Sequence, residues 1–574
     1  ELMRLFGGAQ VAGLMQRLNI DDAVPIAHGM VDRTIEQAQN RVEGAHFDTR
    51  KHLLEYDDVL NQQREIFYSQ RNRVFSKDDL LEDVHSMLST EVENHVEAAL
   101  ADPEGPWKLL AWLEETQPTL NLNSEDPYPS FMLQLLMDEL EGVDEADDLH
   151  QRLLEIARDA LQAQFDHLAR TVDNQLSAAV ERLDDQTEQR VDMAEIAIDG
   201  AIMEAEEIGR QPDARRLIQA VESAAGMKIQ LDEIGEKGIA EDPHTFRQKV
   251  PELVEASLGL RIWAGLIQTI ERRIGESLEL EKRISIPIDW DEAADRLQDA
   301  LHEVWQARIE RQLDEINRDL ENMLGREEEV DEALIIRTLV QMSYGQRMIF
   351  DKKTHQRRSA IIARLSYAFS AAELIDEAEP VSLSQRVLEH LEAAQETLYY
   401  SLGDAELRKS ASPGLMDLSD KLQGSLRRSL GAERFEELAE GGPIANLEED
   451  TQDEIVRQIG QSLLTDSYRQ LILSVGDQLW VDYLTQMEAL RTSIGLEAYG
   501  QRDPLVQYKS RAFDMFQQLL AEIRGGVVHR LFRTQQVAQA QTVAAPTARA
   551  ASAQAAAQQA SSMGSKRRRR RRRR

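Results

Sequence analysis

Few side chains in this sequence have the types and spacing that metal or thiol chemistry requires. Glu82 and His85 form a Glu-x-x-His pair at helical spacing, but a di-iron bundle needs two such pairs and two further carboxylates on facing helices. The His-Glu-x-x-His zinc pattern is absent, and with no cysteine the chain cannot form disulfides or thiolate zinc sites. We therefore interpret Glu82 and His85 as part of an exposed helical face, and expect no metal site and no catalytic residue.

Acid–base and nucleotide chemistry are equally poorly supported. Glu55, Asp57 and Asp58 place three carboxylates within four residues, but on a helix they point in different directions and no histidine or nucleophile is fixed beside them. A structural role, bonding arginines of a neighbouring domain, fits these carboxylates better. No phosphate-binding glycine motif occurs, and the nearest glycine cluster, residues 235–238, is too short to cradle a phosphate. We expect no bound cofactor in this chain.

The strongest candidate for function is the short loop between two amphipathic helical patterns in residues 477–516. The loop carries Ile494, Leu496 and Tyr499, which at the tip of a helical hairpin should not reach the hairpin's own core and would need a partner. Asp503 and Pro504 are an N-cap and a first-turn proline, so the loop is predicted to be short and stiff. The same pattern also fits an ordinary helix–helix turn in which Tyr499 folds back on its own helices.

The charge is strongly acidic and unevenly distributed. The 574 residues carry a net charge of −37, and because Lys566 and Arg567–Arg574 supply +9, the rest carries −46. An acidic body argues against nonspecific duplex binding. The tail, residues 534–574, is rich in Gln, Ala and Ser and is predicted to be disordered. Its arginines, including Arg567, Arg568, Arg569 and Arg570, could bind anionic lipid headgroups or RNA phosphates, or have no partner.

Helical periodicity dominates the chain and predicts a mainly all-α fold. A long helix is expected to begin near Val31 and to continue for about forty residues, roughly 60 Å, long enough to brace several domains. Further apolar stripes at residues 149–183 and 297–323 have the spacing of bundle or coiled-coil helices. We expect a loop-rich junction anchored by Trp107 and Trp112 at 101–129, a strand or extended link at 285–291, and short helices with turns at 411–443. No uninterrupted apolar run reaches the length of a membrane span.

Two stretches of the sequence resemble one family. The first runs from Val42 to Arg71 and contains HFDTRKHLLEYDDV followed by Asn61, Gln63-Arg64, Ile66 and Tyr68. The second is the hairpin, with Asp477, Trp480, Leu484, Met487, Leu490-Arg491, Ile494, Leu496, Tyr499, Asp503-Pro504-Leu505, Tyr508-Lys509 and Met515-Phe516. In this order they are similar to SecA, the ATPase that drives preproteins through the SecYEG channel.

The resemblance implies a role for each stretch. The first would be the scaffold helix that docks on the motor domains, through Arg50, Glu55, Tyr56, Asp57, Asp58 and Arg64. The second would be the two-helix finger, built on Trp480, Leu484, Met487, Arg491, Asp503 and Pro504. Its tip, with Tyr499, Ile494 and Leu496, would contact the channel and the moving polypeptide. ATP and Mg²⁺ would bind motor domains upstream of this chain, so this part would not hydrolyse ATP by itself.

Several features depart from that family. Glu497 stands where the family usually has Arg, and Tyr483 replaces a common His. The zinc tail that docks SecB cannot exist without cysteine. The span from 100 to 465 is longer than the usual wing, so we expect an inserted helical subdomain there.

The predicted organisation has five parts. These are the end of the second motor domain (1–30), the scaffold helix (31–100), a helical wing with an expanded insertion (101–450), the finger and scaffold end (451–533), and the tail (534–574). The expected function is a translocase part at the cytoplasmic face of the membrane, with SecYEG, preproteins and anionic lipids as partners, and a ribosome contact and a homodimer left open. The alternative is an acidic coiled-coil scaffold without motor function.

Overall fold

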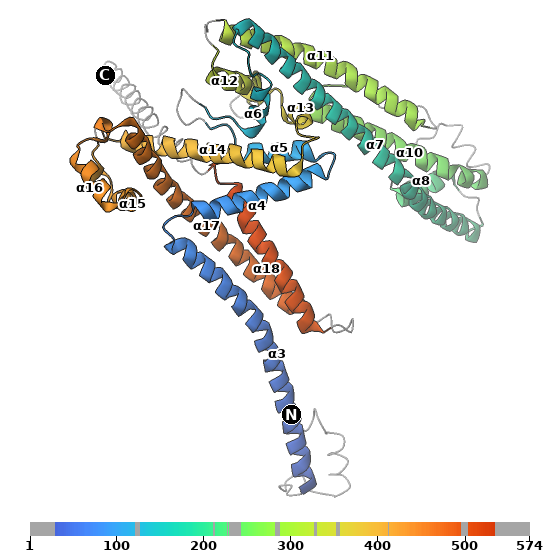
Figure 1. Ribbon diagram of the computed structural model, residues 1–574. Coiled ribbons are helices and arrows are strands. Elements are labelled where there is room, and N and C mark those ends of the chain that lie inside the picture. Colours follow the sequence, from blue (N-terminus) through green and yellow to red (C-terminus); the bar gives the residue numbers. More distant parts are fainter. Residues whose placement is uncertain are drawn as a thin grey trace, which may run out of the picture. The chain divides into compact units, whose positions relative to one another are not determined.

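Figure 1 shows the computed structural model, which describes residues 29–120, 127–209, 213–226, 228, 243–281, 288–325, 330–351, 356–410, 413–494 and 503–533. The chain divides into two compact units. Unit 1 comprises residues up to 98, residues 113–123 and residues from 380 onward, and unit 2 comprises residues 99–112 and 124–379. The regular secondary structure of the described part is helical apart from one two-stranded sheet and isolated bridges, which confirms the mainly all-α prediction. The predicted first segment (1–30) and the tail fall almost entirely outside the described residues.

Unit 1 is built around two long helices, α3 and α17. In chain order its elements are α3 (Gly29–Ser76), α4 (Leu81–Leu100), the end of α5 (Gly105–Thr116), α14 (Pro380–Leu407), η1 (Leu415–Asp417), α15 (Asp420–Leu430), α16 (Ala432–Glu440), η2 (Ile444–Asn446), α17 (Glu449–Ser493) and α18 (Pro504–Val528). The 48 residues of α3 span roughly 72 Å and confirm the predicted long helix. The short elements between 413 and 446 confirm the predicted junction of short helices and turns.

Helices α14 and α17 approach each other closely because glycines lie at their crossing. A β-carbon added to Gly460 of α17 would lie 1.9 Å from the carbonyl oxygen of Tyr399, and one added to Gly403 of α14 would lie 2.0 Å from that of Val456. Such distances leave no room for any side chain, so both positions require glycine at this backbone spacing.

Unit 2 is organised along α7 (Ala146–Glu207), a helix of 62 residues. Its other elements are α6 (Phe131–Asp138), α8 (Ala214–Ala225), α10 (Pro243–Ile274), α11 (Trp290–Leu324), α12 (Glu332–Met342), β1 (Tyr344–Asp351), β2 (Gln356–Ala363) and α13 (Ala368–Glu373). The predicted stripes at 149–183 and 297–323 fall on α7 and α11. Their large residues, such as Leu153, Phe165, Leu301 and Trp305, are buried as predicted.

Helices α7 and α11 run antiparallel, and three polar contacts define their register. Trp305 Nε1 donates to the Leu161 carbonyl at 3.2 Å, Gln298 Nε2 donates to the Ala169 carbonyl at 3.2 Å, and His150 Nε2 lies 2.8 Å from Asn317 Oδ1. Farther along α7, a second core joins its C-terminal third to α8 and α10. Residues 246–274 of α10 are apolar and long enough to span a bilayer by composition, with 33% of the most apolar window buried, and the helix packs on α7 along one face.

The predicted strand or extended link at 285–291 can be followed only from Ile288 onward, where the backbone of Asp289 is extended and leads directly into a helix. Trp290 and Asp291 begin α11, Ile288 and Asp289 are irregular, and 282–287 lie outside the described residues. The only sheet in the described chain is the antiparallel pair β1–β2, in register from Tyr344 opposite Ala363 to Asp351 opposite Gln356. The predicted loop-rich junction at 101–129 also contains a regular helix, α5, which includes both Trp107 and Trp112.

Candidate functional site: a helical hairpin fastened along a long helix

The candidate site in unit 1 is the hairpin of α17 and α18, which packs along the C-terminal half of α3 (Figure 1). The sequence signals at its turn are confirmed. Asp503 caps α18, because its Oδ1 accepts from the backbone amides of Leu505 at 2.8 Å and Val506 at 3.4 Å, and Pro504 follows in the first turn.

Aromatic side chains form the core between the hairpin and α3. The ring of Phe67 from α3 stacks on Trp480 of α17 with centroids 4.4 Å apart and planes 5° from parallel. Tyr56 meets Tyr508 of α18 edge-on at 4.7 Å. Around these pairs the buried cluster is completed by Tyr483, Met487, Leu490, Ile494, Ala512, Phe516 and Leu519. Because each helix contributes large side chains to one cluster, the three helices share a core.

A buried polar bridge lies within that core. Gln63 of α3, which is only 7% exposed, donates through Nε2 to the Ala512 carbonyl of α18 at 2.9 Å. Its Oε1 accepts from the Tyr483 hydroxyl of α17 at 2.7 Å. Burial raises the pKa of Tyr483, so this phenol stays neutral and able to donate. One amide side chain thus links all three helices, and the Tyr483 hydroxyl has a bonding partner of its own.

Two ion pairs flank the core along α3. Arg71 binds Asp477 of α17 with both Nε and Nη2, at 2.8 and 3.0 Å, and this hydrogen bonding lowers the pKa of the Asp477 carboxyl. About fourteen residues earlier on α3, Asp57 Oδ1 lies 3.3 Å from Nη1 of Arg491, near the end of α17. The hairpin is therefore held to α3 at both ends of the shared core.

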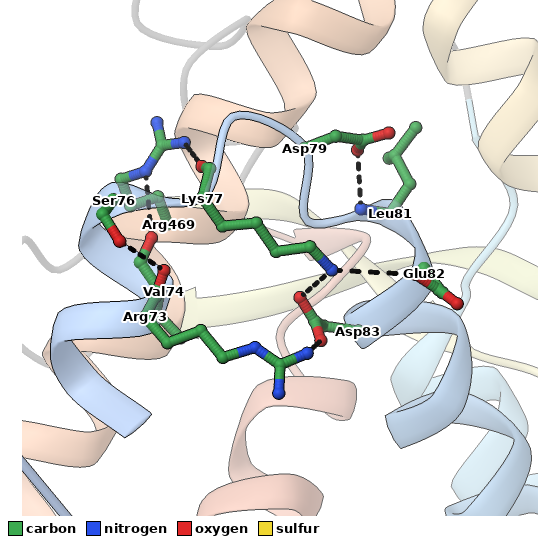
Figure 2. Close-up of polar contacts among 9 residues, drawn as sticks. All are labelled: Arg73, Val74, Ser76, Lys77, Asp79, Leu81, Glu82, Asp83 and Arg469. Carbon is green, nitrogen blue, oxygen red and sulfur yellow. Dashed lines mark hydrogen bonds and ion pairs between the residues drawn. The ribbon is translucent and has the colours of Figure 1, made fainter. Parts of the chain in front are cut away.

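The corner between α3 and α4 is fastened by the same helix α17 (Figure 2). Arg469 donates to the carbonyls of Val74 at 3.2 Å and Lys77 at 2.6 Å. These bonds give partners to carbonyl groups at the C-terminal end of α3 and place a cation at the negative end of the helix dipole. Asp83 of α4 accepts from Lys77 at 2.8 Å and from Arg73 at 2.9 Å. The direction in which the chain leaves α3 is thus determined by side chains of both neighbouring helices.

The tip residues predicted from sequence have different outcomes. The prediction that Ile494 is free for a partner is wrong, because it is 1% exposed and belongs to the hairpin core. Helix α17 continues to Ser493, and Ile494 is its C-cap residue, with a right-handed helical backbone and an amide that donates to the Leu490 carbonyl. Leu496, Glu497 and Tyr499 lie outside the described residues, as do Arg567–Arg570, and their roles stay predictions.

Some of the residues predicted to support the finger or to dock a motor domain have partners within this chain. Trp480 and Met487 are buried, Leu484 is partly buried against the same cluster, and Arg491 pairs with Asp57. Tyr56 also contacts the hairpin. Arg50, Asp58 and Arg64 are exposed, Glu55 lies 4.0 Å from Lys51, and contact with a motor domain stays a prediction for all of them.

Glu82 and His85, the Glu-x-x-His pair, each lie beside a side chain other than a metal ligand partner of the pair. His85 Nδ1 lies 2.9 Å from Glu392 Oε1, and Glu82 lies 3.8 Å from Lys77. Within the described ranges, no three His, Asp or Glu side chains are grouped as a metal site would require.

The sequence interpretation did not assign a role to Gln63, Arg71 or Arg469. Gln63 had a usable signal, since it stands among apolar positions of the α3 stripe, and a buried amide there needs partners. The partners of Arg71 and Arg469 lie about four hundred residues away along the chain, which no local pattern reveals.

Comparison with known proteins agrees with this architecture. A family model described as the SecA Wing and Scaffold domain matches residues 25–535. Proteins named protein translocase subunit SecA are similar over shorter segments: 50% identical over 116 residues in Carboxydothermus hydrogenoformans, 47% over 119 in Pelotomaculum thermopropionicum and 46% over 132 in Syntrophomonas wolfei. These segments cover 20–22% of this chain and only 13–16% of the relatives.

Proposed function

The chain belongs to the SecA wing and scaffold family, and from this premise we propose that it is the part of a protein translocase that couples a moving helix to the transported polypeptide. In this proposal α3 is the scaffold helix and the α17–α18 hairpin is the finger. ATP and Mg²⁺ would bind in motor domains outside this sequence, and the partners would be a SecYEG-type channel and preproteins at the cytoplasmic face of the membrane.

The observation that carries the proposal is the fastening of the hairpin to α3. The stacked Phe67–Trp480 pair, the Gln63 bridge and the two ion pairs extend from Asp57 to Arg71, roughly 21 Å along the helix. A hairpin held over that length follows a displacement of α3 as one body. This is the mechanical property that a finger driven by a motor needs.

The outer surface of the hairpin also supports contact with an apolar partner. Val481 of α17 and Val506 and Phe513 of α18 are 57–62% exposed, although the opposite faces of these helices are buried in the shared core. Apolar contact is non-directional, and a surface of this kind suits a machine that handles unrelated polypeptides.

The test of the working tip is Tyr499→Ala in the complete protein. We expect preprotein transport to slow while basal ATP hydrolysis is largely unchanged. Tyr400→Ala on α14 is the matched control: it removes a partly exposed tyrosine that lies near the start of α17, at the end of that helix opposite the tip, and it should transport normally. Normal transport by Tyr499→Ala would contradict the proposal and favour the scaffold alternative.

The coupling itself can be tested because the chain has no cysteine. Arg71→Cys with Asp477→Cys places two thiols where an ion pair joins α3 to α17, and a short bifunctional maleimide then links them. We expect the linked protein to transport at the rate of the unlinked double variant. Loss of transport on linking would mean that the hairpin must move relative to α3.

A further inference from the structure

The C-terminal third of α7 exposes apolar side chains on one face. Ile196 is 73% exposed, Met203 66% and Met193 47%, so the rest of the chain leaves them largely uncovered. Steps of three and seven residues place all three on the same side of the helix, because an α-helix repeats every 3.6 residues. These three side chains form the outer strip of α7.

The opposite face of the same turns is fixed in the core of unit 2. Ala194 and Ile198 are fully buried in the cluster that joins α7 to α8 and α10 (Figure 1). Arg247 of α10 also binds Glu195 at 3.1 Å and Asp199 at 3.0 Å. The outer strip therefore lies on a helix that is already formed and held in place, so a partner could bind it without first ordering it.

The spacing of the outer strip is that of a coiled-coil seam. With Gly200 between Ile196 and Met203, the positions from Met193 onward follow each other by three, four and three residues, as heptad a and d positions do. A β-carbon added to Gly200 would have nothing within 4 Å. Without a side chain at this seam position, the outer strip has a gap that can receive a large side chain from a second helix.

The positions that flank this seam are acidic. Heptad positions e and g between residues 192 and 206 are occupied by Asp192, Ala197, Asp199, Glu204 and Glu206. Asp199 pairs with Arg247, whereas Asp192, Glu204 and Glu206 make no ion pair within the described residues. A second copy of this face, an anionic bilayer or a nucleic acid would bring like charges together, while a basic helix would be attracted.

We propose that the outer strip of α7 is a docking site for a basic coiled-coil helix of a partner protein. The partner helix carries large apolar side chains at its own a and d positions, one of which enters the gap at Gly200. Lysine or arginine at its e and g positions pairs with Asp192, Glu204 and Glu206. A helix of about 16 residues, roughly 24 Å long, covers the seam. The inference concerns unit 2 alone and does not depend on the proposed transport function.

The test is binding of a synthetic peptide to the full chain, measured by fluorescence anisotropy. The probe has about three heptads with leucine at a and d and lysine at e and g, so its own charges prevent it from pairing with itself. We expect Ile196→Ser/Met203→Ser to weaken binding on the order of tenfold, because the burial of two apolar side chains is lost. The matched control, Val381→Ser/Met416→Ser, removes exposed apolar side chains from unit 1 and should bind as wild type.

A conservative pair of substitutions separates lost contact from a lost fold. Ile196→Leu/Met203→Leu keeps the apolar surface and should restore binding to within about threefold of wild type. Loss of binding in this variant as well would mean that the outer strip is not the contact surface.

Gly200→Leu distinguishes insertion into the gap from general apolar adhesion. The added side chain meets no described neighbour within 4 Å of its β-carbon, so the fold should persist, but it fills the gap and should weaken binding on the order of tenfold. Gly265→Leu on α10, at a glycine that is also exposed and open, is the matched control and should bind as wild type. Tighter binding by Gly200→Leu would contradict the proposal, since adhesion to any apolar surface would gain from leucine.

The flanking charges are tested with Glu204→Gln/Glu206→Gln. We expect binding to weaken about threefold at a salt concentration of about 0.05 M and to change little at about 1 M, where charges at a surface are screened. Glu303→Gln/Glu310→Gln on α11 removes the same charge from exposed positions and should leave binding unchanged.

Three further results would overturn the proposal. The first is equal loss of binding in Ile196→Ser/Met203→Ser and its control in unit 1. The second is equal binding of a peptide of the same composition in scrambled order, which would mean that charge alone attracts the probe. The third is a wild-type dimer in sedimentation that Ile196→Ser/Met203→Ser dissociates, which would assign the outer strip to a contact between copies of this chain.

Discussion

The Gln63 bridge makes the fastening of the hairpin measurable. In Gln63→Leu the Tyr483 hydroxyl loses its acceptor at 2.7 Å and keeps only the Ala512 carbonyl at 3.5 Å. In Tyr483→Phe the Gln63 Oε1 atom loses its donor. Each single change leaves a buried polar atom without a good partner, which costs about 1–3 kcal/mol. Replacing both partners by apolar groups removes the orphaned atoms, so the double variant should cost less than the sum of the singles by about 1–2 kcal/mol.

Local opening should be measured by native-state hydrogen exchange at the amides of α17 and α18. Global denaturation is unsuitable, because the chain has two units and need not unfold in a single step. Exchange at α7 in unit 2 is the internal control and should not change. The free energy of opening is measured at amides near Tyr483 and Ala512 in the wild type, the two single variants and the double variant. The three differences from wild type complete the double-mutant cycle.

Additive effects of the two substitutions would refute the reasoning, because they would mean that Gln63 and Tyr483 contribute independently. Single substitutions that leave exchange unchanged would show that the bridge does not hold the hairpin to α3. In the second case the fastening would rest on the aromatic stacking and the ion pairs alone.

Two further predictions concern packing and pH. Gly460→Ala should destabilise the α14–α17 pair by about 1–3 kcal/mol, because its β-carbon would meet the Tyr399 carbonyl. Gly476→Ala on the same helix has ordinary contacts with Phe67 and should be neutral or stabilising by up to about 1 kcal/mol. Native-state hydrogen exchange at the amides of α14 and α17 tests this, and equal free energies of opening in the two variants would contradict it. Burial lowers the pKa of His167, which stacks on Phe369 at 4.3 Å and lies 3.2 Å from Glu104, with Arg170 and Arg273 also lowering it. The unfolded chain therefore takes up the proton first, so the unfolding free energy of unit 2 should fall as pH drops below about 6.5. His167→Phe should flatten that part of the pH profile, and an unchanged slope would contradict the assignment.

Long periodic elements could be predicted from the sequence, since their signal repeats over many turns. The stripes of α3, α7 and α11 and the Asp503–Pro504 start of α18 were placed correctly because local spacing and capping chemistry determine them. The β1–β2 hairpin was missed for a physical reason. Its turn region reads Lys-Lys-Thr-His instead of a glycine turn, and its strands lack a clean alternation of apolar and polar residues.

The candidate site was predictable in its location but not in its bonding. Helical periodicity placed Gln63 and Phe67 on one face of the long helix, yet their partners Tyr483 and Trp480 are more than four hundred residues away in sequence. The burial of Ile494 was not predicted either. An apolar residue after a helix was assigned to the loop, although tertiary packing draws it into the core.

The antiparallel pairing of α7 and α11 determines which changes in the length of these two helices the fold can accept. Its anchoring contacts, Trp305 with Leu161 and His150 with Asn317, lie toward one end of α7, whereas α8 and α10 close the other end through a separate core. Insertion or deletion of about seven residues in each paired helix restores nearly the same face, since seven residues are close to two turns. The distal core would then shift outward or inward as a block while the anchoring contacts persist. Related sequences can therefore differ in the length of α7 and α11 by whole pairs of helical turns while the contacts that join the two helices are kept.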